Sequence, residues 1–261
     1  MRIFIFMCSL AMFYHASAKE AKSVLVWNEE FNYIGLPDSM KWDFSTVGNL
    51  WQWGNGELQQ YTRMNSNNAY VSNGSLKIRV LNEDGKITSA RLHTKDKGEW
   101  EHARIEVRAK LAAGRGLWSA IWLLPSNWKF SDKYIDGEID IVEHVGFNAD
   151  STFHSTHTYT HSFDRKNTYT LAELVPDCET EFHNYTVEWD RQSVCFFVDD
   201  ILVGSFLHEG HQHLRWTFNQ SYYLILNVAV GGAWASKNGI DKDCFPSEMQ
   251  VDYVRVYRID D

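Results

Sequence analysis

The sequence predicts an all-β protein in which two antiparallel sheets pack as a jelly roll or a similar sandwich. Apolar residues recur at every second position in many short stretches, which is typical of half-buried strands. Turn signals separate these stretches, and no long amphipathic helix interrupts them. The chain has 261 residues, of which 44% are hydrophobic and 15% aromatic. It is therefore long and apolar enough to bury one large core.

Residues 104–110 show the strand pattern most clearly, because every second residue from Ile105 to Ala109 is apolar and charged residues alternate with them. Residues 222–230 are apolar except for Asn227, as expected for a strand buried on both faces. Further strands are expected at residues 75–80, 185–189, 195–198 and 251–257. Turns are expected between them at Asn73-Gly74, Asp84-Gly85, Asp199-Asp200 and Gly231-Gly232. The sequence has no linker and no repeat of fixed period, which indicates a single domain.

The first eighteen residues have the features of a secretory signal peptide. Arg2 supplies a positive charge, residues 3–14 are an apolar run, and Ala16-Ser17-Ala18 is a small-residue cleavage site. The run is too short to span a membrane, and a buried N-terminal strand is the alternative interpretation. We expect residues 1–18 to be removed and residues 19–261 to be secreted as one extracellular domain without a membrane partner.

The charge balance limits the class of ligand. Lys and Arg total 25 against 34 Asp and Glu, which gives a net charge of -9. This balance argues against nucleic acid, which requires a basic surface. The 11 Trp residues instead favour stacking on a flat, neutral ligand.

Cysteines set few constraints. Cys8 is lost with the signal peptide, so Cys178, Cys195 and Cys244 remain. Three cysteines allow at most one internal disulfide, and the spacing does not choose its partners. No C-x-x-C pair is present, so a cysteine-based zinc site is not expected.

Carboxylates are concentrated in residues 137–144, a segment that contains Glu138, Asp140 and Glu143. In a regular strand Glu138 and Asp140 share one face and Glu143 lies on the other. One extra residue, a β-bulge around Ile141-Val142, would return Glu143 to the face of Glu138. We therefore expect three carboxylates side by side on a bulged strand.

Carboxyl pairs of this kind perform glycoside hydrolysis. Two carboxyl groups about 5 to 5.5 Å apart serve a retaining glycosidase as nucleophile and as acid/base. Crowded like charges also separate pKa values, so that one group stays protonated while another is ionised. The alternative interpretation is a solvated acidic face without a catalytic role.

Aromatic residues surround this segment in the sequence. Trp118 and Trp122 are four residues apart, which places both on one face of a strand. Further tryptophans lie in or beside expected loops, at Trp51, Trp53, Trp128 and Trp234. Indole faces match the flat face of a pyranose ring, so together they could line a polysaccharide groove. Burial of Trp118 and Trp122 in the core is the alternative.

Several segments, in order, resemble glycoside hydrolase family 16, and its laminarinase-like endo-β-1,3-glucanases most of all. The bulged strand at 137–143 is similar to the family's active-site strand. Four further stretches resemble family motifs: residues 25–31, 53–62, 88–91 and 251–257, with sequences LVWNEEF, WGNGELQQYT, TSAR and VDYVRVY. The resemblance covers nearly the whole mature chain.

The resemblance implies a concanavalin A-like β-jelly roll and a role for each site residue. Glu138 would be the nucleophile, Asp140 the residue that orients the pair, and Glu143 the acid/base. The positions that would line the sugar subsites are Asn55, Arg91, Trp118, Trp122 and His157. It implies no cofactor for catalysis, but a structural Ca²⁺ on the convex side, held by Glu30, the Gly74 carbonyl and Asp252.

The chain departs from the family pattern at positions outside the catalytic strand. Gly56 replaces an Asn, His102-Ala103 stands where a Tyr-Gly pair is usual, and Ser119 stands where Pro is usual. These departures affect the expected fine structure of the substrate and leave the expected reaction unchanged.

Histidines provide the main rival chemistry. His154, His157 and His161 have spacings that would hold a metal on a helix, but their segment favours a strand, on which His154 and His157 face opposite sides. The stretch from His208 to His213 resembles the zinc motif H-E-x-x-H, but Gln212 stands where the second His belongs. His157 is better explained as a hydrogen-bond donor near a bound sugar.

The sequence therefore predicts a secreted, monomeric, retaining endo-glycosidase that hydrolyses internal β-1,3-glucosidic bonds of laminarin-type glucans. Two alternatives remain open. One is a β-glucan recognition protein without activity, against which the intact Glu138 and Glu143 argue. The other is a sister hydrolase acting on mixed-linkage glucan or on a marine galactan.

Overall fold

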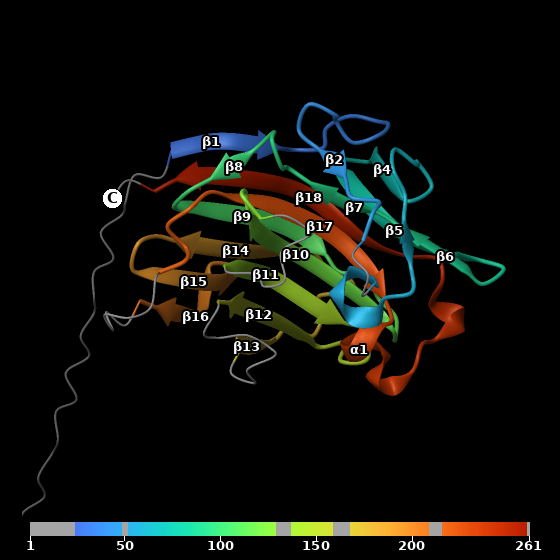
Figure 1. Ribbon diagram of the computed structural model, residues 1–261. Helices are drawn as coiled ribbons and strands as arrows, with labels where there is room; N and C mark the ends of the chain where they lie inside the picture. Colours follow the sequence, from blue (N-terminus) through green and yellow to red (C-terminus); the bar gives the residue numbers. More distant parts are fainter. Residues whose placement is uncertain (1–23, 49–51, 129–136, 159–167, 209–215, 260–261) are drawn as a thin grey trace, which may run out of the picture.

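The chain folds into two β-sheets that pack face to face, as Figure 1 shows for the computed structural model. The structure describes residues 24–48, 52–128, 137–158, 168–208 and 216–259, so the expected signal peptide lies outside the described residues. The first sheet contains, in spatial order, β16 (Ile201–Leu207), β15 (Ser193–Val198), β14 (His183–Trp189), β9 (Ala103–Lys110), β18 (Ser247–Arg258), β5 (Ser75–Glu83), β6 (Lys86–Ser89) and β3 (Gln60–Tyr61), with β1 (Val24–Glu29) paired to β18 and β4 (Ala69–Ser72) paired to β5.

The second sheet carries the segment with the three carboxylates. Its spatial order is β13 (Tyr169–Leu174), β12 (Ser151–His157), β11 (Glu138–Val145), β10 (Leu117–Pro125), β17 (Tyr222–Val230), β7 (Arg91–His93) and β2 (Asp43–Phe44), with β8 (Glu99–Trp100) paired to β17. Within the described residues every strand pair is antiparallel except β3 with β6. The prediction of an all-β jelly-roll sandwich is thus confirmed.

The burial of two strands explains how the sequence builds this sandwich. In β9 the residues alternate between buried and partly exposed along the whole strand, so Ile105 and Val107 enter the core and the charged side chains face outward. In β17 all nine residues are buried, as its apolar sequence predicts. Leu224 and Leu226 of β17 belong to the same apolar core as the β9 residues, which lies between the sheets.

Helical segments are short, and most of them follow β17 of the second sheet. After β17 come α1 (Gly232–Ala235) and two 3₁₀ turns, at Ser236–Asn238 and Lys242–Cys244. An irregular turn, η1 (Gln52–Gly56), contacts α1. Within the described part of the chain, no helix has the length and hydropathy needed to cross a membrane. Cys178, Cys195 and Cys244 are free thiols.

Candidate active site

The expected bulge is present in β11. Against β10, Val142 pairs with Ile121 and Asp140 pairs with Trp122, so Ile141 is the extra residue. Ile139, Ile141 and Val142 all lie in the core. The strand begins after Gly137, whose φ of 112° and close approach to the Tyr222 hydroxyl leave no room for a side chain.

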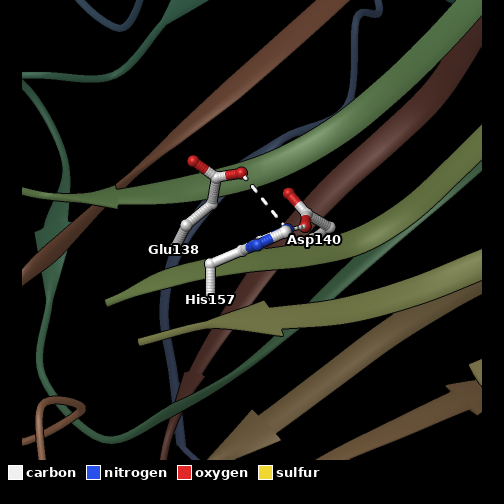
Figure 2. A group of neighbouring side chains, drawn as sticks. All are labelled: Glu138, Asp140 and His157. Carbon is white, nitrogen blue, oxygen red and sulfur yellow. Dashed lines mark ion pairs between the residues drawn. The ribbon is translucent and has the colours of Figure 1, made fainter. Parts of the chain in front are cut away.

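The β11 bulge and the neighbouring strand together assemble an acidic cluster. His157 of β12 pairs in register with Glu138, and its Nε2 lies 3.0 Å from Asp140 Oδ2 and 3.7 Å from Glu138 Oε1. Figure 2 shows the imidazole directed at both carboxylates. The Asp140 side chain is only 4% exposed, whereas that of Glu138 is 17% exposed. Asp140 thus lies beneath the surface, and Glu138 remains accessible.

The proton affinities of the two glutamates differ from those of free carboxyl groups. Burial, followed by the charge of Asp140, raises the pKa of Glu138 to about 7. Burial and the charges of Asp140 and Glu138 raise the pKa of Glu143 well above its usual range. Glu143 is therefore the carboxyl that keeps its proton near neutral pH, and Glu138 is the one that ionises first.

His157 supplies the positive charge of the cluster. Burial lowers its pKa, but the carboxylates of Glu138 and Asp140 outweigh burial and raise the pKa of His157 to about 10. The ligand atoms of Glu138, Asp140 and His157 lie within 4.8 Å of one another, a spacing that a metal ion also requires. With the imidazole protonated, these three residues form an ion-paired cluster.

Trp118 marks one end of the site. Its indole Nε1 donates a hydrogen bond to Glu143 Oε1 at 3.0 Å. The ring packs edge-on against Trp234 of α1, with centroids 5.2 Å apart, and Trp234 in turn packs against Phe153. Trp118 is half-buried and lies beside the acid/base candidate Glu143, and its contact with a sugar stays a prediction.

The other end of the site is built around Arg91. Its guanidinium is buried between the rings of Trp53 and Trp122, 4.9 and 4.7 Å from their centroids. Trp122 Nε1 donates to Asn227 Oδ1 at 2.8 Å, and Asn227 Nδ2 donates to the Tyr61 hydroxyl. The single polar residue of the buried strand β17 therefore orients Trp122.

Asn55 reaches the site through a residue that the sequence did not single out. Its Nδ2 donates to Glu57 Oε1 at 3.1 Å, and the charges of Glu57 and Arg91 influence each other. The predicted site residues of β10 and β11, His157 and Arg91 lie together, and Asn55 joins them through Glu57. Glu57, Gln59 and Asn227 were missed, although Glu57 and Gln59 lie in the motif at residues 53–62 and Asn227 interrupts an apolar strand.

The predicted calcium ligands Glu30, Gly74 and Asp252 do not line one common cavity. Gly74 and Asp252 line one cavity of about 440 Å³ on the first sheet, and Glu30 is not among its lining residues. Arg255 binds both carboxylate oxygens of Glu30, at 2.9 and 2.8 Å. Arg108 lies 2.5 Å from Asp252. Because an arginine holds each carboxylate, the residues as placed do not fit Ca²⁺, and the ion stays a prediction of the resemblance.

The rival histidine sites receive no support from the residues that are described. His154 is buried, and its Nδ1 lies 2.6 Å from the Ile141 carbonyl, on the opposite side of β12 from His157. His161 lies outside the described residues, as do His211 and His213. The His208 ring stacks on the Trp216 ring, and their centroids lie 4.9 Å apart.

Two neighbouring carboxyl groups on a β-sandwich strand flanked by tryptophans are the arrangement that a glycoside hydrolase uses. The sequence profile of Glycosyl hydrolases family 16 matches residues 57–255. The chain is 44% identical to a β-glucanase of Rhodothermus marinus, covering 90% of this chain and 85% of that protein. It is 31% identical to a glucan endo-1,3-β-glucosidase of Cryptopygus antarcticus, covering 89% and 91%.

A solved structure agrees with these sequence matches. The X-ray structure of the laminarinase from Rhodothermus marinus superimposes with a TM-score of 0.86 at 43% identity, covering 92% of this chain and 98% of that one. The chain therefore belongs to glycosyl hydrolase family 16.

Proposed function

We propose that this protein is a secreted, retaining endo-β-1,3-glucanase that cleaves laminarin-type glucans by double displacement. The observation that carries the proposal is the bulge of β11, which brings Glu138, Asp140 and Glu143 so close together that burial and their charges raise the pKa of both glutamates. A retaining enzyme needs one ionised carboxylate and one protonated carboxyl group at the same time.

In the first step Glu138 attacks the anomeric carbon and the bond to the leaving oxygen breaks. Glu143 transfers its proton to that oxygen, so the product leaves as a neutral alcohol and the sugar remains esterified to Glu138. Trp118 holds Glu143 in place through the hydrogen bond to Oε1. His157 lowers the pKa of Glu138 and so favours the ionised nucleophile.

In the second step a water molecule loses a proton to Glu143 and attacks the anomeric carbon. The ester bond breaks and Glu138 regains its negative charge. Esterification of Glu138 has by then removed one of the charges that raise the pKa of Glu143. The pKa of Glu143 therefore falls when this residue must act as a base.

The substrate is proposed from the relatives and from the aromatic surroundings. The relatives named above are a β-glucanase, a glucan endo-1,3-β-glucosidase and a laminarinase. Trp118 and Trp122 lie half-buried on β10, directly beside β11, where each can stack on a neutral sugar ring. The Arg91 guanidinium packs over the Trp122 ring, so Trp122 can stack on a sugar only with its other face.

Export and a monomeric state complete the proposal. Export rests on the sequence alone, because the signal-like segment 1–18 lies outside the described residues. Secretion is tested by N-terminal sequencing of the exported protein, which should begin at Lys19. Size-exclusion chromatography with light scattering should give the mass of one mature chain.

Reducing-sugar release from a polysaccharide panel tests the activity. The panel contains laminarin, mixed-linkage β-glucan, agarose, carrageenan and xyloglucan, with Glu138→Gln as the blank. We expect release from laminarin that the variant lacks, and NMR of the first product should show a β-anomer. Release only from another polymer would make the protein a sister hydrolase. Laminarin binding without any release would make it a recognition protein.

A further inference from the structure

Glu57 is a buried carboxylate at the edge of the site that the proposed reaction does not use. It is 9% exposed and follows the turn η1, next to the end of β17. Burial raises its pKa, and hydrogen bonds from Asn55 and Gln59 oppose that change. Burying a carboxylate costs free energy unless hydrogen bonds compensate for the lost water. The hydrogen bonds of Glu57 to Asn55 and Gln59 supply this compensation.

The partners of Glu57 connect η1 to β17 of the second sheet. Asn55 Nδ2 donates to Oε1 at 3.1 Å and Gln59 Nε2 donates to Oε2 at 2.7 Å. Gln59 Oε1 in turn accepts a hydrogen bond from the Val230 backbone at 2.7 Å. Both carboxylate oxygens are thus used, and Glu57 is fixed to β17 through Gln59.

The backbone around Asn55 leaves little freedom for another arrangement. Gln52 and Trp53 adopt φ angles of 51° and 63°, in the left-handed region that non-glycine residues rarely occupy. The Asn55 backbone and Cβ also lie so close to Gly232 that a side chain there would touch them. Asn55 is itself exposed, so its amide would rotate freely without the bond to Glu57.

The chemistry of the two groups determines which atom Asn55 presents. A carboxylate only accepts hydrogen bonds, so the Asn55 amide must turn its NH₂ group toward Glu57. Its Oδ1 then points away from Glu57 as a hydrogen-bond acceptor. A sugar hydroxyl can donate a hydrogen bond, so it fits this acceptor.

We propose that Glu57 is a positioning residue that fixes the Asn55 amide so that Oδ1 accepts a hydrogen bond from a substrate hydroxyl. The inference rests on the proposed function, because it assigns the substrate a sugar hydroxyl at Asn55. Glu57 makes no contact with the substrate and acts through its neighbour.

The substitution Glu57→Gln tests this role because it replaces one acceptor oxygen with a donor and keeps the shape. The Gln amide can donate to Asn55 Oδ1 and so reverse the Asn55 amide. We expect KM for laminarin to rise about 3- to 10-fold, the value of one hydrogen bond, with a smaller change in kcat. Glu83→Gln, an exposed residue of β5, is the matched control for loss of one charge and should leave both constants unchanged.

A double-mutant cycle distinguishes positioning from a general structural role. If Glu57 acts through Asn55, Glu57→Gln raises KM in the wild type and has no further effect in Asn55→Ala. An equal rise of KM in both backgrounds would overturn the proposal. If Glu57→Gln does not fold, Asn55→Asp replaces it, because an aspartate cannot donate to Glu57. Its KM should rise similarly, and an unchanged KM would also overturn the proposal.

The design separates failure of this inference from failure of the proposed function. Hydrolysis of laminarin by the wild type, with an additive cycle, overturns only the role of Glu57. If the wild type binds laminarioligosaccharides without hydrolysing them, the proposed activity fails and the same cycle is measured as Kd by calorimetry. A wild type that neither binds nor cleaves the glucan overturns both.

Discussion

Rows of charged residues lie on both sheets, but they are arranged in opposite ways. On β9 of the first sheet, Arg104 forms ion pairs with Glu106, Glu188 and Asp200 at 2.7, 2.6 and 2.9 Å. These carboxylates raise the pKa of Arg104 further above its already high value. On β11 of the second sheet, three carboxylates crowd together with one histidine as their cation. Around Arg104 each carboxylate is paired with a positive charge. On β11 burial combines with carboxylates that outnumber the positive charge, so the pKa values of Glu138 and Glu143 rise.

The Arg104 ion pairs therefore contribute to stability, whereas the crowded carboxylates of β11 shift pKa values in the way that acid/base chemistry requires. Opposite charges at matched positions of neighbouring strands stabilise a sheet modestly. Like charges beneath the surface destabilise the ionised form and hold a proton near neutral pH. If this contrast is correct, substitutions on β11 change activity most and substitutions around Arg104 change stability alone.

The largest expected effect is loss of activity in Glu138→Gln and Glu143→Gln. Each variant removes a group that transfers a proton or forms the covalent bond, so kcat on laminarin should fall at least about 10³-fold. Glu106→Gln on the first sheet is the control and should keep full activity. Circular dichroism should show that all three variants are folded. Activity within tenfold of the wild type in either β11 variant would contradict the assignment.

Removal of the histidine cation should have the next largest effect. His157 lowers the pKa of Glu138, so in His157→Gln the pKa of Glu138 rises above about 7. The rate then increases with pH only at higher values, because the nucleophile must be ionised. In a plot of kcat/KM against pH, the ascending limb marks the ionisation of Glu138. For each pH unit by which this limb moves upward, we expect kcat/KM at pH 6 to fall about tenfold. An unmoved limb in the pH profile would show that His157 acts by contact with the sugar instead.

The crowded carboxylates should also reduce stability as the pH rises. Glu138 has a folded pKa of about 7 against about 4.5 when unfolded, so its stabilising contribution is full below pH 4.5 and is lost as the pH rises through 7. Glu138→Gln does not titrate and avoids this loss. Differential scanning calorimetry should therefore give the variant a Tm a few degrees above that of the wild type at pH 8. The gain should shrink at pH 5, and a Tm below the wild type at pH 8 would contradict the argument.

The smallest expected effect on activity comes from Arg104→Met. The substitution removes three ion pairs, and two of the partner carboxylates, those of Glu188 and Asp200, are 36% and 76% exposed. Water can solvate these two groups once Arg104 is gone, so the cost stays at about 1 kcal/mol. For a domain of this size, the corresponding decrease in Tm is about 2 to 4 °C. Laminarin hydrolysis should remain within twofold of the wild type. A large loss of activity would show that the two sheets are not as independent as the contrast requires.

The sandwich and the bulged strand β11 could be predicted because their signals are local. Alternation identified β9, an apolar run identified β17, and the spacing of Glu138, Asp140 and Glu143 required the bulge at Ile141. Each of these signals lies within about ten consecutive residues. They depend only on the side-chain period of a strand.

The contacts of Glu57 and His157 could not be predicted, because they depend on register between distant segments. The link from Glu57 to β17 runs through Gln59 and Val230, which are 171 residues apart in the sequence. His157 meets Asp140 because β12 pairs with β11 in one particular register. Nothing in the surrounding sequence of either residue records these pairings. A buried acid and an ion-paired histidine therefore look like ordinary polar residues until the sheet is assembled.

Covalent trapping tests the central claim most directly. A laminaribiosyl fluoride with fluorine in place of the 2-hydroxyl group forms the glycosyl-enzyme quickly and hydrolyses slowly, because fluorine destabilises both transition states and fluoride is a good leaving group. After proteolysis, mass spectrometry should find one label per chain, esterified to Glu138. A label on Asp140 or Glu143, or none in a preparation that hydrolyses laminarin, would contradict the account.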